Sequence, residues 1–167
     1  MMKKVCIFGG AGFVGGNLAT ALKAKKYKTF QVDINKKSDD ILYGDIRSMK
    51  DCDNYTNGMD IVVHLAGELP HAGWAGDLPV GTMWDTMVNG TRKVLNACLE
   101  NNVKKLIFYS SSAVYGDPPN YVLKEDAPHA PLDEYGKAKS EAENRCHEYM
   151  KRGLNVTIIR PMTILGP

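Results

Sequence analysis

The sequence predicts an α/β protein of the Rossmann type, with a doubly wound, mainly parallel sheet covered by helices on both faces. Three observations predict this class. Short apolar runs alternate with longer segments of helical periodicity, which implies crossovers between parallel strands. A glycine-rich turn follows the first apolar run directly. The length of 167 residues suits one ordinary domain and no second full one.

The elements follow one another regularly along the chain. Strands are predicted at residues 4–8, 29–33, 41–43, 60–65, 105–109 and 156–159. Helices are predicted at residues 13–26, 82–101 and 135–151. The run at 60–65 is almost continuously apolar and β-branched, which is typical of a central strand buried on both faces. In the helix at 82–101, one face is predicted from Met83, Met87, Val94, Leu95 and Cys98.

Two loops rich in proline and glycine interrupt this rhythm, at residues 69–80 and 117–133. Each follows the C-terminal end of a predicted strand. Open α/β sheets bind their ligands at that edge, so both loops are expected beside a ligand site.

The composition excludes several classes of function. Hydrophobic residues make up 44% and charged residues 24% of the chain, as in ordinary globular proteins. The 21 Lys and Arg nearly balance 19 Asp and Glu, so no nucleic-acid or anionic-membrane partner is expected. No apolar run approaches the length of about 18 residues that a spanning helix needs.

Four cysteines lie far apart in the chain, without a CxxC pair and without histidines at metal-ligand spacing: Cys6, Cys52, Cys98 and Cys146. This distribution predicts reduced thiols in a cytoplasmic protein, and no metal site.

The glycine-rich turn is the first motif that carries chemistry. Gly9, Gly12 and Gly15 form GxxGxxG between a strand and a helix. Glycine lets a pyrophosphate approach the backbone, and the helix N-terminus then offers free N–H groups to the anion. The alternative is a tight turn between strand and helix that binds nothing.

Asp33 ends the second predicted strand, eighteen residues after Gly15. In a dinucleotide-binding fold a carboxylate here accepts hydrogen bonds from the adenosine ribose and repels a 2′-phosphate, which favours NAD over NADP. Lys36 and Lys37 follow closely and would weaken that preference. The alternative is a solvated aspartate in a turn.

Tyr135 and Lys139 are spaced as YxxxK, which places both side chains on one helix face. An ammonium beside the phenol is expected to lower the tyrosine pKa from about 10, making Tyr135 a proton donor or acceptor for an alcohol and ketone pair. A serine cluster at residues 110–112 follows a strand and precedes this pair. A hydroxyl there could donate to the same oxygen.

Six ordered motifs together resemble a known family. They are the glycine turn, Asp33, Gly44-Asp45-Ile46-Arg47, His64-Leu65-Ala66-Gly67, the SSSAVYG and YGKAK pair, and the segment from Arg160-Pro161 to Gly166-Pro167. Over residues 3–167 the chain resembles the extended short-chain dehydrogenases, in the NAD-dependent epimerase/dehydratase branch that includes UDP-glucose 4-epimerase.

The resemblance implies a set of site residues. Catalytic roles fall to Ser111, with Ser112 as a less favoured substitute, to Tyr135 as acid/base, and to Lys139. NAD-binding positions are implied for Gly9, Gly12, Phe13, Val14, Gly15, Asp33, Asp45, Ile46, Leu65, Ala66, Gly67, Tyr135 and Lys139. Of these, Asp45 and Ile46 would flank the adenine. Asn89 matches a helix asparagine that holds the architecture of the site.

The resemblance also implies how the chain is organised. Residues 1–167 would form the NAD-binding domain, and the part that grips the substrate would be absent from this chain. The expected assembly is a homodimer, and the chain alone is expected to be inactive.

Three functions remain open from the sequence. The favoured one is an NAD-dependent sugar-nucleotide epimerase acting on a nucleotide-sugar. Related 4,6-dehydratases carry Asp-Glu after the catalytic hydroxyl, where this chain has Ser112 and Ala113, so elimination is disfavoured. The second is an NAD-dependent dehydrogenase or reductase of a non-sugar alcohol or ketone, and the third is a non-catalytic dinucleotide-binding module.

Overall fold

A computed structural model describes residues 2–68, 80–117 and 123–166 of the chain. Six parallel strands form one sheet in the order β3-β2-β1-β4-β5-β6, which confirms the predicted Rossmann-type fold. The strands are β1 (Lys4–Phe8), β2 (Lys28–Asp33), β3 (Ile41–Tyr43), β4 (Ile61–His64), β5 (Lys105–Tyr109) and β6 (Val156–Ile159). The strand order reverses between β1 and β4, so the crevice at the carboxyl ends of these two strands is where such a sheet binds its ligand.

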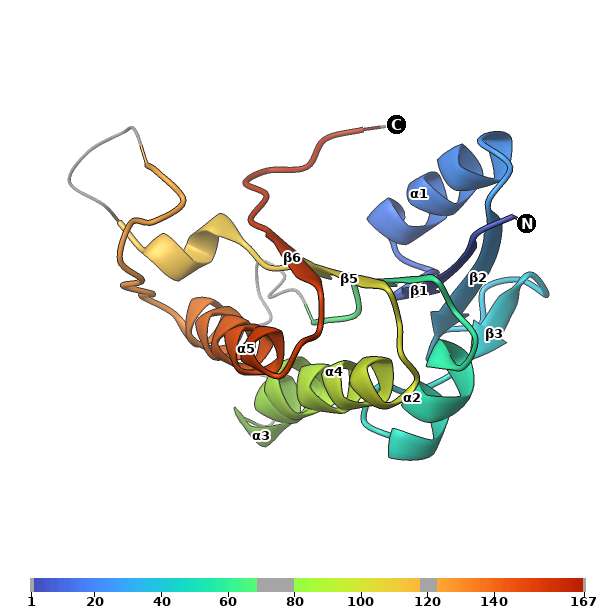
Figure 1. Cartoon of the computed structure of the whole chain (residues 1–167). Helices are drawn as coiled ribbons and strands as arrows, with labels where there is room; N and C mark the ends of the chain where they lie inside the picture. The colour runs from blue at the N-terminus through green and yellow to red at the C-terminus, as the bar shows by residue number, and fades with distance from the viewer. Residues whose placement is uncertain (1, 69–79, 118–122, 167) are drawn as a thin grey trace.

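Helices cover both faces of this sheet (Figure 1). The helices are α1 (Phe13–Ala24), α2 (Met49–Thr56), α3 (Val80–Trp84), α4 (Thr91–Glu100) and α5 (Glu134–Lys151). In Figure 1, α1 lies on one side of the sheet, whereas α2, α4 and α5 lie on the other, and the segment after β6 runs back on the side of α1.

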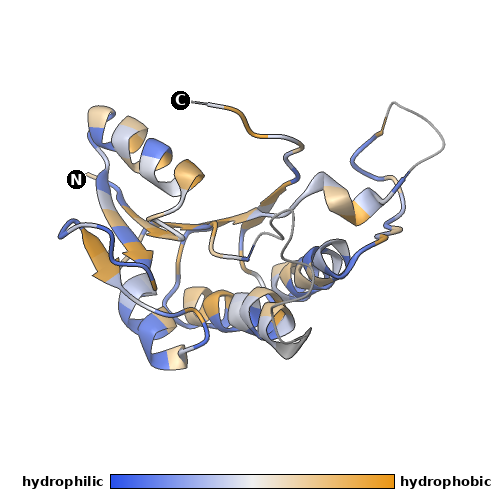
Figure 2. Ribbon diagram, turned by 180° about the vertical axis from the view of Figure 1, so that it is seen from behind, coloured by the Kyte–Doolittle hydropathy of each residue, from blue (hydrophilic) through white to orange (hydrophobic). Residues whose placement is uncertain are grey.

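The two faces of β1 serve two separate apolar layers. Cys6 and Phe8 pack into the larger layer, under α2, α4 and α5. Val5 and Ile7 point the opposite way and pack with Ala19 of α1. Figure 2 shows the strands as the most continuously apolar part of the chain. This double burial is what the uninterrupted apolar runs predicted.

The helix predicted at 82–101 is not continuous. A π-helical turn, Asp85–Gly90, separates α3 from α4. Thr91 closes this turn by donating from Oγ1 to the Met87 carbonyl at 2.6 Å. The buried His64 ring is 2.9 Å from the same hydroxyl, which leaves the ring nitrogen Nε2 as the donor.

Four of the five residues of the predicted apolar face are buried, namely Met87, Val94, Leu95 and Cys98, whereas Met83 is only partly buried. Helix α2 was missed, since only Cys52 and Thr56 of its eight residues are buried. It begins at a Ser48 cap, whose hydroxyl accepts from the Asp51 amide at 3.3 Å.

Other predicted boundaries shift by one or two residues. Helix α1 stops at Ala24, because Lys26 adopts a left-handed conformation with φ of 62°. Of the two predicted loops, residues 69–79 and 118–122 lie outside the described residues, and residue 80 begins α3.

All four cysteines are buried thiols without a disulfide. Among the residues that the structure describes, no helix is long and apolar enough to cross a membrane. The same residues hold no cluster of three metal-ligating side chains.

Candidate functional site

A cleft of about 830 Å³ opens at the carboxyl edge of the sheet. It runs from the turn after β1 past the ends of β2 and β3 to the ends of β4, β5 and β6, and its far wall is α5. Nearly every residue predicted for the site lines it: Gly9, Gly12, Phe13, Val14, Gly15, Asp33, Asp45, Ile46, Leu65, Ala66, Gly67, Ser111, Tyr135 and Lys139. Asn89 is not among the lining residues of the described chain.

The glycine turn at the cleft leaves no room for side chains. A Cβ on Gly15 would lie 2.3 Å from the Gly9 carbonyl oxygen, and one on Gly9 would lie 2.7 Å from the Ala66 amide nitrogen. Gly9 also has φ of 83°, which favours glycine. The wall of the cleft here is therefore bare backbone.

Helix α1 begins at this turn without a side-chain cap. Gly12 occupies the N-cap position, and the first turn carries no acidic residue. The exposed amides and the helix dipole are thus available to an anion. A bare backbone wall beside an uncapped twelve-residue helix fits the pyrophosphate of a dinucleotide.

Asp33 lies on the opposite side of the turn, at the end of β2. Its carboxylate accepts from the Ala11 amide at 3.0 Å and from the Asn35 amide at 2.9 Å. Lys37 also lines the cleft and donates to the Ala11 carbonyl at 3.3 Å, whereas Lys36 faces Asp39 at 3.8 Å. One of the two lysines named from the sequence therefore reaches the cleft.

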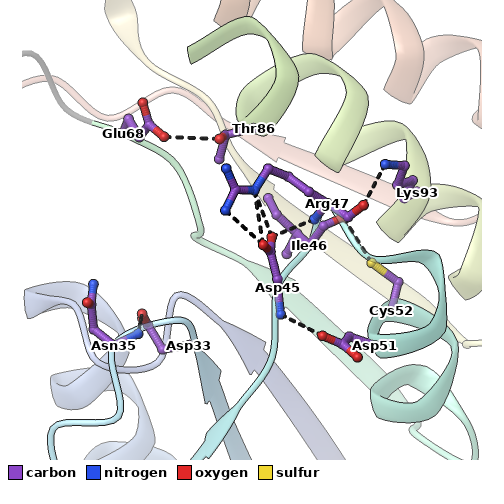
Figure 3. Close-up of polar contacts among 10 residues, drawn as sticks. All are labelled: Asp33, Asn35, Asp45, Ile46, Arg47, Asp51, Cys52, Glu68, Thr86 and Lys93. Atoms are coloured by element: carbon purple, nitrogen blue, oxygen red, sulfur yellow. Dashed lines mark hydrogen bonds and ion pairs between the residues drawn. The ribbon is translucent and has the colours of Figure 1, made fainter. Parts of the chain in front are cut away.

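Past the end of β3, Asp45 forms an ion pair with Arg47. The guanidinium contacts both carboxylate oxygens, and the closest approach is 2.8 Å from Nη2 to Oδ2 (Figure 3). This ion pair holds the pKa of Asp45 below its usual value, although partial burial opposes it. Ile46 between them is buried and packs against Gly90 of the π-helical turn.

The segment after β4 forms the floor of the cleft. Leu65, Ala66 and Gly67 pass under the glycine turn, and Glu68 then accepts a hydrogen bond from the Thr86 hydroxyl at 3.0 Å (Figure 3). Asn89 donates to the Asp85 carboxylate at 3.1 Å within the π-helical turn. The role expected for Asn89, to hold the architecture of the site, stays a prediction.

Ser111 and Tyr135 meet at the far end of the cleft, from different elements. Ser111 caps the 3-10 turn Ser112–Tyr115, with its Oγ accepting from the Ala113 amide at 3.1 Å. Tyr135 stands in the first turn of α5. The two elements touch closely, since a Cβ on Gly136 would lie 2.6 Å from the Ala113 carbonyl oxygen.

The expected lowering of the Tyr135 pKa is not found. Burial raises the pKa of Tyr135 above its usual value, while the Ser111 hydroxyl acts in the opposite direction. Lys139 does not offset this, because its Nζ donates to the Tyr109 carbonyl at 2.8 Å and lies 5.8 Å from the centre of the Tyr135 ring.

Lys139 is itself an unusual cation. It is only 6% exposed, and burial lowers its pKa to about 8. A Cβ on Gly67 would lie 3.6 Å from its Nζ, so the lysine reaches across the floor of the cleft. Near neutral pH it is close to the point at which it gives up its proton.

A buried ion pair supports this end of the cleft. Glu143 lies one turn after Lys139 on α5, is fully buried, and accepts from Arg160 at 2.6–3.1 Å. Arg160 also donates to the Tyr115 hydroxyl at 2.6 Å. The end of β6, the 3-10 turn and α5 are thereby held together.

Several lining residues were not singled out from the sequence. They are Lys37 (named only as a modifier), Arg47, Glu68, Thr86, Ser110, Pro161, Met162 and Ile164. Ser110 is buried, and its hydroxyl has no hydrogen-bond partner within the described chain. Arg47, Ser110, Pro161, Met162 and Ile164 lie inside the recognised motifs, so their motifs were a signal for them. Glu68 and Thr86 lie outside the motifs and carry no local signal.

Comparison with known proteins gives one consistent result. The model of the NAD dependent epimerase/dehydratase family matches residues 5–167. The N-acetyl-alpha-D-glucosaminyl-diphospho-ditrans,octacis-undecaprenol 4-epimerase of Escherichia coli O157:H7 is 36% identical over 99% of this chain and 50% of its own length. The UDP-glucose 4-epimerase of Vibrio cholerae is 30% identical over 100% of this chain and 53% of its own.

Among solved structures, the UDP-glucuronic acid 4-epimerase from Bacillus cereus in complex with NAD superposes with a TM-score of 0.83 and 28% identity. The match covers 98% of this chain and 57% of the other. The chain thus spans about half the length of the relatives that it matches.

Proposed function

The chain belongs to the NAD-dependent epimerase/dehydratase family, and from this we propose that it is the NAD-binding portion of a sugar-nucleotide epimerase. The observation that carries the proposal is that one cleft is continuous. It joins an uncapped glycine turn and Asp33 at one end to Ser111, Tyr135 and Lys139 at the other. One extended dinucleotide would contact both ends.

The residues divide between binding and chemistry. The turn from Gly9 to Gly15 would take the pyrophosphate, Asp33 the adenosine ribose, and Asp45 with Ile46 the adenine. Leu65, Ala66 and Gly67 would line the middle of the cofactor. Asn89 would hold the π-helical turn above them.

When bound, NAD would supply the hydride acceptor and donor that epimerisation through a ketone requires. Tyr135 would move the proton of the sugar hydroxyl, and Ser111 would hydrogen-bond the same oxygen. Lys139, which is buried and weakly basic, would bind the nicotinamide ribose. Once its ammonium leaves the Tyr109 carbonyl, it would lower the pKa of Tyr135 and so favour the phenolate.

We also propose that most substrate contacts come from outside these residues. The curated relatives are about twice as long as the match, which supports a separate substrate-binding part. Without it, the effective concentration of the sugar hydroxyl at Tyr135 would be lost, an advantage of about 7–11 kcal/mol. Residues 1–167 alone should therefore show little turnover. Assembly as a homodimer and a cytoplasmic location also remain predictions.

The experiment is turnover of UDP-sugars, followed by NMR, in a polypeptide that joins these residues to a substrate-binding part of the family. Tyr135→Phe keeps the ring and removes the proton carrier, so the rate should fall about 10²–10⁴-fold. Tyr43→Phe is the matched control, because Tyr43 is exposed at the end of β3. A near-normal rate for Tyr135→Phe contradicts the mechanism. Release of NADH with accumulation of a ketone would instead indicate a dehydrogenase.

A further inference from the structure

One edge of the molecule carries a local excess of positive charge. Five exposed lysines, which we call the lysine patch, lie at the start of β1, at the end of α1 and at the start of β2: Lys3, Lys4, Lys25, Lys26 and Lys28. Within residues 2–68, 80–117 and 123–166, none of these five side chains forms an ion pair. The balanced charge of the whole sequence, which predicted no anionic-membrane partner, does not show this local excess.

The pairing of β1 with β2 brings these lysines together. Lys4 is the register partner of Lys28, and the Lys28 amide donates to the Lys3 carbonyl at 3.0 Å. Figure 1 shows the N-terminus beside the C-terminal end of α1. One open hollow there is lined by Met2, Lys3, Lys25, Lys26 and Tyr27. Because all strands of the sheet are parallel, this edge lies opposite the carboxyl edge that holds the cleft.

Lys26 occupies a backbone position that usually belongs to glycine. Its amide donates to the Lys23 carbonyl at 3.0 Å, and the Tyr27 amide donates to the Leu22 carbonyl at 3.0 Å, which ends α1 in a Schellman motif. Such a motif needs a left-handed residue, and Lys26 has φ of 62°. Every other residue with positive φ in the described part of the chain is glycine or asparagine. A lysine therefore stands where glycine would be less strained.

The dipole of α1 accounts for only part of the lysine patch. Cations near the last turn of a helix interact favourably with its carbonyl end, which suits the lysines at the end of α1. The lysines at the starts of β1 and β2 have no such role. Asp60, which precedes β4, already accepts from Nζ of Lys104 at 2.6 Å and from the Lys4 amide at 2.8 Å. The charge of the patch is therefore available to a partner outside the chain.

We propose that the lysine patch binds an anionic phospholipid surface, with the side chain of Met2, which is 64% exposed, entering the headgroup region. Clustered lysines are attracted to acidic lipids by the negative potential of the lipid surface. An exposed apolar side chain beside lysines suits lipid better than nucleic acid, for which arginines and stacking aromatic rings would be expected. This role is independent of the proposed function, and it leaves the cleft directed away from the lipid.

The test is co-sedimentation of the 167-residue chain with vesicles of phosphatidylcholine that contain phosphatidylglycerol, and with vesicles of phosphatidylcholine alone. The chain should bind only the anionic vesicles, and binding should weaken as salt is added. Lys25→Gln combined with Lys28→Gln should lower the affinity about tenfold or more, at about fivefold for each lysine. The matched control is Lys50→Gln combined with Arg92→Gln, which removes two exposed charges from the first turns of α2 and α4 and should bind like the wild type.

Lys26→Gly separates a docking role from a structural one. Glycine relieves the left-handed strain, so thermal unfolding should move to a higher temperature. The affinity for anionic vesicles should nevertheless fall about fivefold, because one charge of the patch is lost. A structural role alone would change the first measurement and leave the second unaltered.

Several results would overturn the inference. It fails if the wild-type chain does not bind anionic vesicles, or binds vesicles of phosphatidylcholine alone equally well. It also fails if the paired patch variant and its control bind alike, or if Lys26→Gly binds like the wild type. Tighter binding to a DNA duplex than to anionic vesicles would replace the lipid surface by a nucleic acid. None of these results bears on NAD binding, which is measured separately.

Discussion

At the scale of single residues, the cleft separates two kinds of group. The carboxylates of Asp33 and Asp45 are fixed by hydrogen bonds, Asp33 by backbone amides and Asp45 by Arg47. Burial raises the pKa of Tyr135 and lowers the pKa of Lys139, so for both side chains it favours the neutral form. The first kind suits recognition of a dinucleotide, and the second suits proton transfer.

Asp33→Asn should narrow the preference for NAD over NADP by about tenfold, or about 1.4 kcal/mol, because it removes a negative charge that faces the 2′-phosphate. The amide keeps the shape of the side chain. Calorimetric titration with both cofactors measures this ratio. Asp40→Asn, at an exposed position, makes the same change in net charge and should leave the ratio unaltered. Equal effects of the two variants would remove the role given to Asp33.

His64 should make the chain sensitive to acid. Burial lowers its pKa to about 3 from an ordinary 6.5. As the pH falls below about 6.5, the unfolded chain binds a proton that the folded chain does not. The free energy of unfolding should therefore drop by up to about 1.4 kcal/mol per pH unit, down to about pH 3.

Urea unfolding at several pH values between 7 and 5 checks this expectation. His64→Gln should flatten the pH dependence, whereas His147→Gln, at an exposed position on α5, should keep the wild-type slope. Identical slopes in the wild type and His64→Gln would show that the buried ring is not the titrating group.

The limits of sequence reasoning are also visible at this scale. The glycine turn and Asp33 were predictable because each depends on its own stretch of chain. The direction in which the Tyr135 pKa shifts was not predictable, because it depends on the burial of the ring and on Lys139 donating to the Tyr109 carbonyl instead of facing the phenol. The ion pair between Arg47 and Asp45 depends in the same way on side-chain geometry.

At the scale of elements, long apolar runs predicted the strands reliably, because both faces of the sheet are covered. Helix α2 was not predicted, because only two of its residues are buried and its sequence therefore shows no clear apolar periodicity. The π-helical turn was not predicted. Thr91, which follows the turn, contacts His64 of the distant strand β4 through its hydroxyl, and such a tertiary contact leaves no mark on the local sequence. No periodicity within residues 85–90 could reveal it.

Two adjacent glycines of α1 should respond oppositely to alanine. Gly15→Ala should destabilise the chain by about 1–3 kcal/mol, since its Cβ would lie 2.3 Å from the Gly9 carbonyl oxygen. Gly16→Ala meets nothing within 4 Å and should stabilise the chain by about 0.5–1 kcal/mol. Thermal or urea unfolding compares the pair. A Gly15→Ala variant as stable as the wild type would contradict the close packing of the turn.

At the scale of the whole molecule, the described surface retains apolar side chains that this chain does not cover. Leu165 is 86% exposed, Met162 83% and Leu132 74%. Met87 of the π-helical turn and Tyr149 of α5 lie in the chain's own core, so these two side chains offer no apolar surface to a homodimer. We therefore expect association through the exposed segment after β6, which carries Met162 and Leu165.

Light scattering should give a mass well above the 18.4 kDa of one chain at high concentration. Met162→Ser combined with Leu165→Ser should reduce the larger species, because it removes the most exposed apolar side chains of that segment. A monomeric mass for the wild type at all concentrations would count against both the homodimer and the apolar surface.

The central claim is that one dinucleotide spans the cleft from Asp33 to Tyr135. The most direct measurement is a titration of the isotope-labelled chain with NAD, followed residue by residue through the NMR shifts of backbone amides. Binding should perturb the glycine turn, Asp33, Gly67, Ser111 and Tyr135 together, with one common dissociation constant. The amide shifts of residues at the opposite edge of the sheet, such as Lys3 and Lys104, should not change. The account is contradicted if NAD leaves the spectrum unchanged or perturbs only one end of the cleft.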